Sequence, residues 1–278
     1  MSPSRRKKNR FRRADGPGNG KNGYLYILKK THFLFKKTVI SVLDLSDIFA
    51  RERTLFPAGL EGRIRWDVMD FRELGGTMCF CETESAGVIR RRLAGPDPAG
   101  PDGREGSRIH WIDTGDYHYL TYFFLERIDR PFELLLFDNH PDDQPSVFGE
   151  GLLSCGGWVR TARERLPLLS RMISIGPEAE PSVWERCPDK PGGVSELPVY
   201  VSIDKDVLSK EFARTDWTQG EMTLTDLMES LEALRGREVL GVDICGGLTV
   251  SKGASDDDFT INSRTDSFLI DRLLDIII

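Results

Sequence analysis

The chain has 278 residues, of which 39% are hydrophobic, and this is enough to bury one large α/β core or two small ones. A single domain is the better expectation, because α/β folds of this length are often undivided. The formal net charge is −6, so the overall charge of the chain does not indicate a polyanion-binding surface.

A basic run, RRKKNRFRR, occupies residues 5–13 and is followed by a stretch rich in Gly, Pro and Asn up to Gly23. Such a run is typical of a nucleic-acid or membrane-surface arm, or of a solvated tail. A block this short, with one aromatic residue, does not specify a partner. We therefore predict a disordered basic tail over residues 1–23, a single α/β domain over residues 24–278, and no nucleic-acid binding.

Neither a membrane anchor nor a disulfide framework is expected. No stretch approaches the roughly 18–20 consecutive apolar residues that a membrane helix needs, and the basic run is followed by polar glycines where a signal sequence has an apolar segment. The five cysteines are odd in number and scattered. These features predict a cytoplasmic protein, in which Cys79 and Cys81 are packed thiols on a strand.

Short apolar runs that end in polar clusters alternate with helix-like stretches along the chain. The predicted strands are Thr38–Leu43, Arg108–Asp113, Phe132–Phe137, Met172–Ile175, Val199–Ile203 and Val239–Ile244. The predicted helices are Tyr119–Ile128, Val159–Leu169 and Leu224–Leu234, the last capped by Thr223 or Thr225. Two stretches rich in Pro and polar residues, Gly95–Ser107 and Glu178–Leu197, are predicted to be surface excursions. The alternation predicts a mainly parallel sheet covered by helices on both faces.

A group of metal-competent residues follows the strand predicted over Phe132–Phe137. The chain runs from this strand directly into Asp138, His140 and Asp142. In an open parallel sheet the ligand crevice lies beyond the carboxyl ends of the strands, so these side chains emerge where a site is expected. Taken alone, the segment fits a polar turn equally well, because Asp, Asn and Pro are ordinary turn formers.

A second strand, Val199–Ile203, ends in Asp204 and Asp206. Two parallel strands would then bring five metal-competent groups to one edge of the sheet. Clustered carboxylates repel one another and raise each other's pKa, and a divalent cation removes that repulsion. Ligation by carboxylates with one or two imidazoles suits Mn²⁺, with Zn²⁺ or Fe²⁺ as competitors.

The four histidines of the chain differ in their positions relative to the predicted strands. His118 follows the strand Arg108–Asp113, as His140 follows its own strand, and it is predicted to be a further metal ligand. His110 lies within its strand and is predicted to be a packed histidine. His32 lies in a basic, aromatic stretch with no carboxylate nearby, and it is assigned no role.

The order of these motifs resembles the arginase and agmatinase (ureohydrolase) family. That family has a Gly-Asp-His segment, then Asp-x-His-x-Asp at a strand end, then Ser-x-Asp-x-Asp, which begins at Ser202 here. The match runs from Ile109 to Cys245, about half of the chain. The first motif departs from the pattern, because Tyr117 separates the aspartate from His118.

The resemblance implies a three-layer αβα sandwich with a mainly parallel, arginase/deacetylase-like sheet and a binuclear manganese site. It also implies six ligands in two sets joined by bridging carboxylates: His118 and Asp142 for one ion, His140 and Asp206 for the other, and Asp138 and Asp204 as the bridges. Water held between two divalent ions becomes a hydroxide nucleophile near neutral pH. It would attack a planar carbon, and Asp142 would pass the proton to the leaving nitrogen.

Two positions depart from the family and bear on the substrate. Cys155 stands where the family has a histidine that shuttles protons, and no histidine follows His140. Cys155 is therefore a catalytic candidate beside Asp142, with a buried thiol lining the pocket as the alternative. The glutamate that holds a guanidinium in arginase-like enzymes is replaced by glycine at Gly246, so arginine and agmatine are not expected as substrates.

The prediction is a metal-dependent hydrolase that cleaves a carbon–nitrogen bond in a small amidine- or amide-type substrate. One alternative is a non-catalytic, metal-binding member of the same fold, which both departures favour. Another is a mononuclear zinc deacetylase-like enzyme, although those enzymes use paired active-site histidines that this chain lacks. Glu221 or the acidic cluster Asp256–Asp258 would replace the missing carboxylate only by folding toward the site, and we expect both to be solvated.

Overall fold

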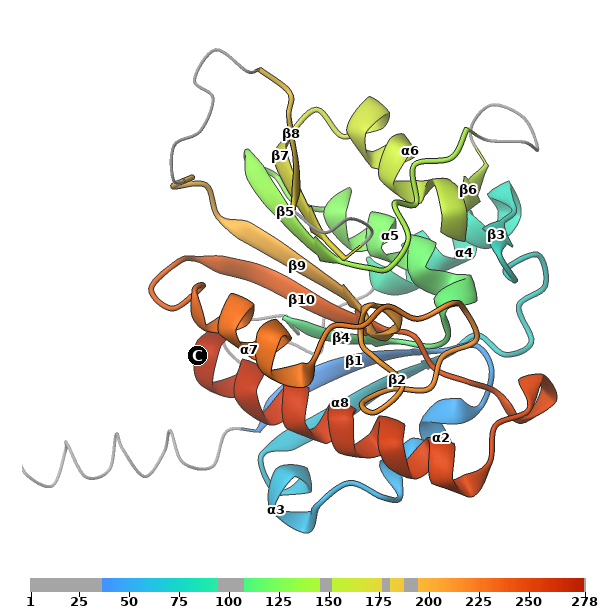
Figure 1. Cartoon of the computed structure of the whole chain (residues 1–278). Helices are drawn as coiled ribbons and strands as arrows, with labels where there is room; N and C mark the ends of the chain where they lie inside the picture. Colours follow the sequence, from blue (N-terminus) through green and yellow to red (C-terminus); the bar gives the residue numbers. More distant parts are fainter. Residues whose placement is uncertain (1–36, 95–107, 146–151, 177–180, 188–194, 278) are drawn as a thin grey trace, which may run out of the picture. The chain divides into compact units, whose positions relative to one another are not determined.

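The computed structural model describes residues 37–94, 108–145, 152–176, 181–187 and 195–277. This part contains an eight-stranded sheet (Figure 1). Its strands are β1 (Thr38–Asp44), β2 (Ile64–Asp70), β4 (Ile109–Ile112), β5 (Phe132–Phe137), β7 (Leu169–Ile175), β8 (Ser182–Glu185), β9 (Val199–Asp204) and β10 (Val239–Cys245). They follow the spatial order β2-β1-β4-β10-β9-β5-β7-β8, and only β7 and β8 are antiparallel. A separate small sheet pairs β3 (Phe80–Cys81) with β6 (Leu153–Ser154).

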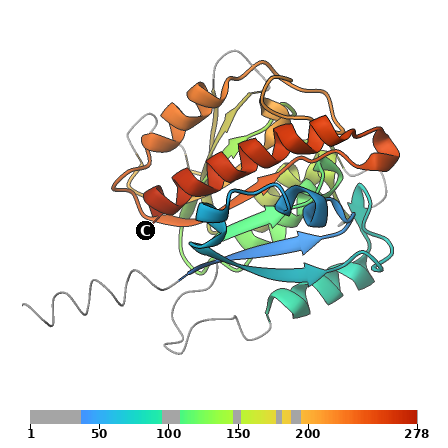
Figure 2. The same cartoon turned by 90° about the horizontal axis from the view of Figure 1, so that it is seen from below.

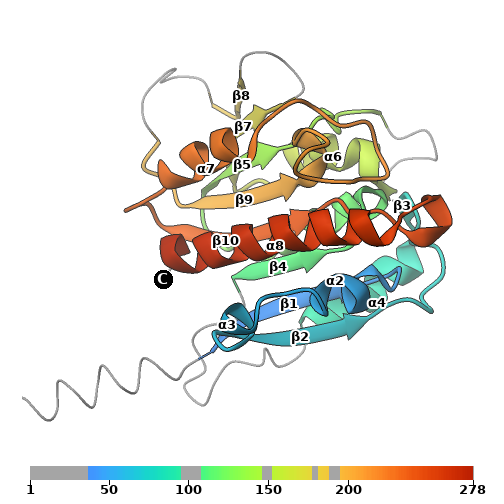
Figure 3. The same ribbon diagram turned by 60° about the horizontal axis from the view of Figure 1, so that its bottom comes forward.

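Helices cover both faces of the large sheet and form a three-layer αβα sandwich (Figure 3). One face carries α2 (Ile48–Arg53), α3 (Ala58–Glu61), α7 (Leu224–Glu232) and α8 (Asp256–Ile277). The other carries α4 (Thr83–Leu93), α5 (Thr121–Leu125) and α6 (Trp158–Arg165). The short 3-10 helices are η1 (Gly115–Leu120), η2 (Cys155–Gly157), η3 (Lys205–Val207) and η4 (Val250–Lys252). In Figure 2, α8 and α4 lie on opposite sides of β1 and β2.

The central strands are apolar on both faces because each face supplies a separate core. In β5, Leu135 and Phe137 pack with α7 and α8, whereas Leu134 and Leu136 pack with the core on the opposite face. Side chains alternate between the two faces of a strand, so a strand covered on both sides is a continuous apolar run. The predicted fold class is confirmed by this arrangement.

Strand register brings the residues of the predicted site together. Phe137 of β5 is paired with Ile203 of β9, and Ile203 is paired with Ile244 of β10. Ile244 is in turn paired with Trp111 of β4. The carboxyl ends of these four parallel strands therefore lie at one edge of the sheet, and the segments that follow them are neighbours in space.

All six predicted strands are present. The strands β2, β6 and β8 and the helices α2, α3, α4 and α8 were not predicted. The strand β8 lies inside Glu178–Leu197, the stretch predicted to be a surface excursion, and it pairs with β7 at the edge of the sheet. Its residues are only half-buried or exposed, so it lacks the apolar run of a central strand. The burial along β2 is also irregular. The other predicted excursion, Gly95–Ser107, lies outside the described residues.

All three predicted helices are shorter than expected, and the one predicted over Leu224–Leu234 ends at Glu232. The stretch Tyr119–Ile128 is divided between η1 and α5, and α5 ends at Leu125. The helix predicted over Val159–Leu169 ends at Arg165, because the next residue adopts an extended backbone before Pro167. The cap of α7 is confirmed as Thr223, which forms a reciprocal capping box with Asp226.

All five cysteines are free thiols, which confirms the absence of a disulfide framework. Cys81 lies on β3, but Cys79 precedes that strand and has a positive φ of 59°, so only one of the two is a strand residue as predicted. Within the described residues, no helix combines the length and apolarity needed to span a membrane. The basic tail over residues 1–23 and His32 lie outside the described part of the chain.

Candidate metal centre

The six predicted ligands gather at the edge formed by the carboxyl ends of β4, β9 and β5. Two groups of side chains have potential donor atoms that all lie within 4.8 Å of one another. These are His118, Asp138 and Asp142 in one group, and Asp138, His140 and Asp206 in the other. Asp138 belongs to both groups, so the two potential sites share a carboxylate.

His118 is the centre of the first group. Its Nδ1 lies 3.1 Å from Oδ2 of Asp138 and 3.4 Å from Oδ2 of Asp142. The same nitrogen lies 3.5 Å from Oδ2 of Asp204, which brings the sixth predicted ligand to the group. All four side chains are buried. The chain therefore points three carboxylates at one imidazole nitrogen in a water-poor environment.

In the second group, His140 Nδ1 lies 2.8 Å from Oδ2 of Asp206 and 3.7 Å from Oδ1 of Asp138. Backbone amides hold the carboxylates in place. Asp138 Oδ1 accepts from the N–H of His140 at 2.7 Å, and Asp206 Oδ1 accepts from the N–H of Asn139 at 2.9 Å. Asp204 Oδ1 accepts from the N–H of Asp206 at 2.9 Å. Each carboxylate is thus fixed through one oxygen, and its second oxygen faces the cluster.

The negative charges of the clustered carboxylates repel one another. Burial, together with the charge of Asp138, raises the pKa of Asp142 to about 7. Burial also raises the pKa of Asp206 to about 6, although its hydrogen bond with His140 acts in the opposite direction. Burial and the charge of Asp206 raise the pKa of Asp204 well above its usual value. Burial alone would also raise the pKa of Asp138, but hydrogen bonds from the two histidines lower it. Positive charge inside the cluster would relieve this repulsion.

The two histidines supply that positive charge as protons. Hydrogen bonds to Asp138 and Asp206 raise the pKa of His140 to about 10. Burial alone would lower the pKa of His118, but the carboxylates of Asp138 and Asp142 raise it well above its usual value. A divalent cation bound to the same carboxylates would displace these protons, because a ligating imidazole is neutral.

A buried hydrogen-bond chain orients His118. Ser202 Oγ donates to Oδ1 of Asp243 at 2.6 Å and lies 3.0 Å from His118 Nε2. Since the single hydroxyl proton of Ser202 is engaged with Asp243, the serine accepts from Nε2–H. The tautomer fixed in this way leaves Nδ1 to face the carboxylates, as in metal sites where a second partner sets the ligating nitrogen.

The additional residue in the first motif is accommodated by the 3-10 helix η1. The ring of Tyr117 is buried in the core beneath α4, α5 and α6. The carboxylate of Asp116 points elsewhere and binds Lys252 Nζ at 2.6 Å. His118 still reaches the cluster, so the departure from the Gly-Asp-His spacing does not remove it from the site.

His140 is the exposed member of the cluster, with 28% of its side chain accessible. Its Nε2 lies 3.0 Å from Oγ1 of Thr218, and its ring packs edge-on against Trp217 with centroids 5.6 Å apart. The indole of Trp217 also lies over Gly115, where an added Cβ would lie 2.7 Å from the ring. The loop containing Trp217 and Thr218 therefore covers the cluster beside its exposed histidine.

Asp142 has an unusual backbone and a specific partner. Its φ is 46°, in the left-handed region that Asp tolerates better than most residues. Oδ2 accepts a hydrogen bond from Trp158 Nε1 at 2.7 Å. The same indole packs against His118, with ring centroids 5.0 Å apart. Trp158 thus fixes one ligand candidate and forms a wall beside another.

Cys155 lies near the cluster but belongs to neither group of potential ligands. It is 8% exposed, and its backbone N–H donates to the carbonyl of Cys79 at 2.9 Å. Burial, followed by the charges of its neighbours, raises the pKa of the Cys155 thiol to about 12. At neutral pH this group is therefore a buried, protonated thiol and not a thiolate nucleophile.

Gly246 has no space for a side chain. Its φ is +92°, and an added Cβ would lie 2.4 Å from Oδ1 of Asp204 and 2.9 Å from the backbone nitrogen of Lys205. The two candidate replacements for a carboxylate do not fill this place. Glu221 is exposed, and in the cluster Asp256–Asp258 two residues are exposed while Asp258 pairs with Arg214 at 3.1 Å.

Several residues that support the cluster were not found from the sequence. Trp158 and Trp217 carry no motif, and their roles depend on which loops the fold brings together. Asp243 was noted only as part of a strand, although a carboxylate inside an apolar β10 sequence was a signal for a buried polar partner.

No protein-family model matches the chain. An uncharacterized protein of Thermotoga maritima is 36% identical over 147 residues, which cover 50% of this chain and 57% of that protein. The match thus spans little more than half the length of this relative.

Solved structures give a wider match. Arginase from Medicago truncatula aligns with a TM-score of 0.56 and 15% identity over 87% of both chains. A hypothetical agmatinase from Burkholderia thailandensis aligns with a TM-score of 0.55 and 15% identity over 84% of both chains. A triple mutant of the T. brucei arginase-like protein, bound with Mn²⁺, aligns with a TM-score of 0.56 and 14% identity over 92% of this chain and 98% of that one.

The chain therefore has the arginase-like α/β fold. The resemblance to the arginase and agmatinase family that the motifs indicated is confirmed at the level of this shared fold.

Proposed function

We propose that the chain is a metal-dependent hydrolase that cleaves a carbon–nitrogen bond in a small amidine- or amide-type substrate. The observation that carries the proposal is the pair of His/Asp groups that share Asp138. In the proposed site His118 and Asp142 would hold one ion, His140 and Asp206 would hold the other, and Asp138 and Asp204 would contribute to both. Manganese is the proposed metal, with zinc or iron as competitors, because oxygen donors outnumber nitrogen donors.

The donor set fits divalent cations. His118 Nδ1 and Asp138 Oδ2 are buried and lie 3.1 Å apart, so that a protonated His118 forms an ion pair with this carboxylate. A divalent cation bound to both atoms would take the place of that proton. Divalent ions at such a site supply Lewis acidity, which lowers the pKa of water and polarises a carbonyl or imine.

Residues of the chain are proposed to orient the ligands and to transfer protons. Ser202 and Asp243 hold His118 in one tautomer, and the indole of Trp158 holds Asp142. We propose that Asp142 accepts a proton from the attacking water and delivers it to the leaving nitrogen. Cys155, as a protonated thiol beside the site, is proposed as a donor or pocket-lining group and not as a nucleophile.

The substrate is proposed to lack a guanidinium group. A cationic guanidinium needs a facing carboxylate, and the backbone at Gly246 leaves no room for one. We therefore expect no urea release from arginine or agmatine.

A non-catalytic protein that binds metal for stability or sensing is the second candidate. It is favoured by the replacement of the shuttle histidine by Cys155, since no histidine follows His140. A mononuclear zinc, deacetylase-like enzyme is a third possibility, and it would require only one of the two groups.

Metal analysis separates these candidates. We expect two ions per chain after reconstitution with Mn²⁺, and fewer in Asp138→Ala and Asp204→Ala. Asp143→Ala is the matched control, because Asp143 is adjacent to Asp142 but pairs with Arg163 at 2.8 Å outside both groups. One ion per chain would favour the mononuclear site. No bound Mn, Fe or Zn before or after reconstitution would refute the proposal, and bound metal without hydrolysis of a panel of small amides and amidines would favour the non-catalytic candidate.

A further inference from the structure

Two cysteines face each other at the end of the small sheet formed by β3 and β6. In this sheet Phe80 is paired with Ser154 in antiparallel register. The adjacent position of the same register places Cys79 opposite Cys155, and the backbone N–H of Cys155 donates to the carbonyl of Cys79 at 2.9 Å. Two thiols that are far apart in the sequence are therefore held on neighbouring backbones.

The separation of these backbones suits a disulfide bond. Residues directly opposite each other in antiparallel strands have Cα atoms about 4.5–5.5 Å apart. A disulfide needs about 4.4–6.8 Å between the two Cα atoms. The thiols also interact with each other, because burial and a hydrogen bond to Asp116 raise the pKa of Cys79 to about 11, whereas the neighbouring thiol of Cys155 acts in the opposite direction.

The other three cysteines have no such partner. Cys81 lies opposite Leu153, which carries no thiol. Cys245 is buried in β10, and its Sγ donates to the carbonyl of Thr114 at 3.2 Å. Cys187 is exposed. Among the described residues, which include all five cysteines, one pair of thiols is thus opposed across two strands.

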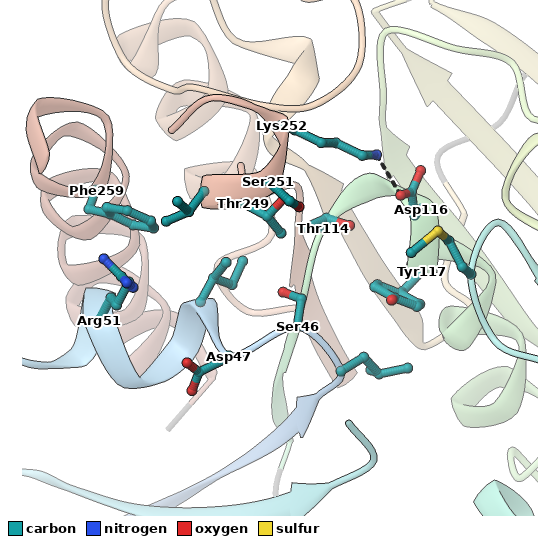
Figure 4. A pocket seen from close by; sticks show the side chains of 14 residues that line it. Ser46, Asp47, Arg51, Thr114, Asp116, Tyr117, Thr249, Ser251, Lys252 and Phe259 are labelled. Atoms are coloured by element: carbon teal, nitrogen blue, oxygen red, sulfur yellow. Dashed lines mark hydrogen bonds and ion pairs between the residues drawn. The ribbon is translucent and has the colours of Figure 1, made fainter. Parts of the chain in front are cut away.

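Cys79 is the more accessible member of the pair. Its side chain is half-buried, and its Sγ donates to Oδ1 of Asp116 at 3.2 Å. Asp116 and Met78 line a cavity of about 370 Å³, in which the carboxylate of Asp116 is turned toward Lys252 (Figure 4). A small molecule in this cavity would be adjacent to Cys79, whereas Cys155 is only 8% exposed.

Cys155 belongs to a segment that supports the metal cluster. It begins η2, which leads directly into α6. In α6 the backbone N–H of Val159 donates to the carbonyl of Asp142 at 3.1 Å, and Trp158 Nε1 donates to the carboxylate of the same residue at 2.7 Å. A covalent bond at Cys155 would therefore attach β3 to the segment that holds a predicted metal ligand.

We propose that Cys79 and Cys155 form a reversible disulfide by exchange with small-molecule disulfides, which makes the pair a modification site in the wall of the candidate metal cluster. In the first step the sulfur of Cys79 attacks one sulfur of the small disulfide, and one small thiol leaves from the mixed disulfide. In the second step the sulfur of Cys155 attacks that of Cys79, the mixed bond breaks, and a second small thiol leaves. The two protein thiol protons end on the two small thiols, so one small disulfide is reduced for each protein disulfide formed.

Thiol counting in the full chain tests the proposal. The background is Cys187→Ser, which removes the exposed thiol and leaves four of the five cysteines. The protein is equilibrated with 2-hydroxyethyl disulfide at pH 8, with a chelator present, until the thiol count is constant, because raised pKa values make the exchange slow. We expect two of the four thiols to disappear and to return with dithiothreitol, and peptide mapping to join Cys79 to Cys155 within one chain.

Thermal melting gives a second readout of the same sample. A disulfide between residues far apart in the sequence constrains the unfolded chain, so the melting temperature should rise by roughly 5–10 °C on oxidation and return on reduction. Cys79→Ser and Cys155→Ala should each abolish this rise. Cys81→Ser is the matched control, because it lies two residues from Cys79 and should keep both the crosslink and the rise.

Four free thiols after equilibration would overturn the proposal, as would a crosslink that involves Cys81 or Cys245 or that joins two chains. Oxidation of the same two thiols in the Cys81→Ser background, and its absence in Cys155→Ala, would support it. Because the chelator removes metal throughout, this result does not depend on the proposed hydrolase, and absence of metal binding would leave it intact.

Discussion

Lys205 is an ammonium group buried between the sheet and α8, and it depends on a carboxylate from that helix. Its side chain is 1% exposed, and its Nζ lies 2.8 Å and 2.9 Å from the two oxygens of Asp266, which is 0% exposed. Glu52 is buried beside the pair, and burial raises its pKa to about 8. Near neutral pH the three groups therefore hold one positive and one negative charge, with Glu52 protonated.

We predict that Glu52→Gln/Asp266→Asn is less stable than Glu52→Gln by about 3–5 kcal/mol, because the double variant leaves the ammonium buried without a negative charge. Asp266→Asn alone should lose less, since Glu52 releases its proton and replaces the missing charge. The measurement is the free energy of unfolding from urea titration at pH 7, with a chelator present so that bound metal does not contribute.

The control for this experiment is Asp271→Asn on the same helix. Asp271 pairs with Arg63 at the surface, where both side chains are nearly half exposed, so its loss should cost about 1 kcal/mol or less. If the double variant lost no more stability than this control, Lys205 would not be a buried charge that requires a carboxylate.

Three further changes test other parts of the structure. Because burial raises the pKa of Glu52 from 4.5 to about 8, its protonation stabilises the fold fully below pH 4.5, and this contribution is lost as the pH rises toward 8. The parent should therefore lose stability relative to Glu52→Gln between pH 5 and pH 8, whereas parallel profiles of the urea midpoint would count against the argument. Gly246→Ala should lower the free energy of unfolding by about 1–3 kcal/mol, from the left-handed backbone and from the contact with Asp204. An unchanged melting temperature would show that the backbone relaxes there. Trp158→Phe keeps an aromatic ring but removes the N–H donor to Asp142, so Mn²⁺ affinity measured by chelator competition should fall about tenfold. Unaltered affinity would mean that this hydrogen bond does not orient the carboxylate.

The central part of the fold was predictable because it depends on local pattern. The run Phe132–Phe137 is apolar at each position except Glu133, and the structure places it in the middle of the sheet. Peripheral elements such as β2 and β8 were not found, since a half-covered strand has no continuous apolar run. The long helix α8 was also missed, because Asp266 and other polar residues interrupt its apolar face.

The positions of the strand ends predicted which residues meet at the site, but they did not predict the residues that pack around it. Asp138 and Asp204 were predictable neighbours because parallel strands in register end at one edge. Lys205 lies between two of the predicted ligands and has no motif of its own, yet its side chain is buried beneath α8, where it binds Asp266. Contacts of this kind, like that between Trp158 and Asp142, depend on tertiary packing that a single sequence does not contain.

The tight backbone at Gly246 also limits how the specificity of this chain can change. A single substitution that introduced a glutamate there would push against Asp204 and thereby disturb the cluster it was meant to serve. Recognition of a guanidinium group would therefore require several coordinated substitutions, which would begin with a different backbone path for the segment after β10. Changes in ligand preference are more accessible near α2 and η4, where side chains can be exchanged without moving the residues of the candidate metal cluster.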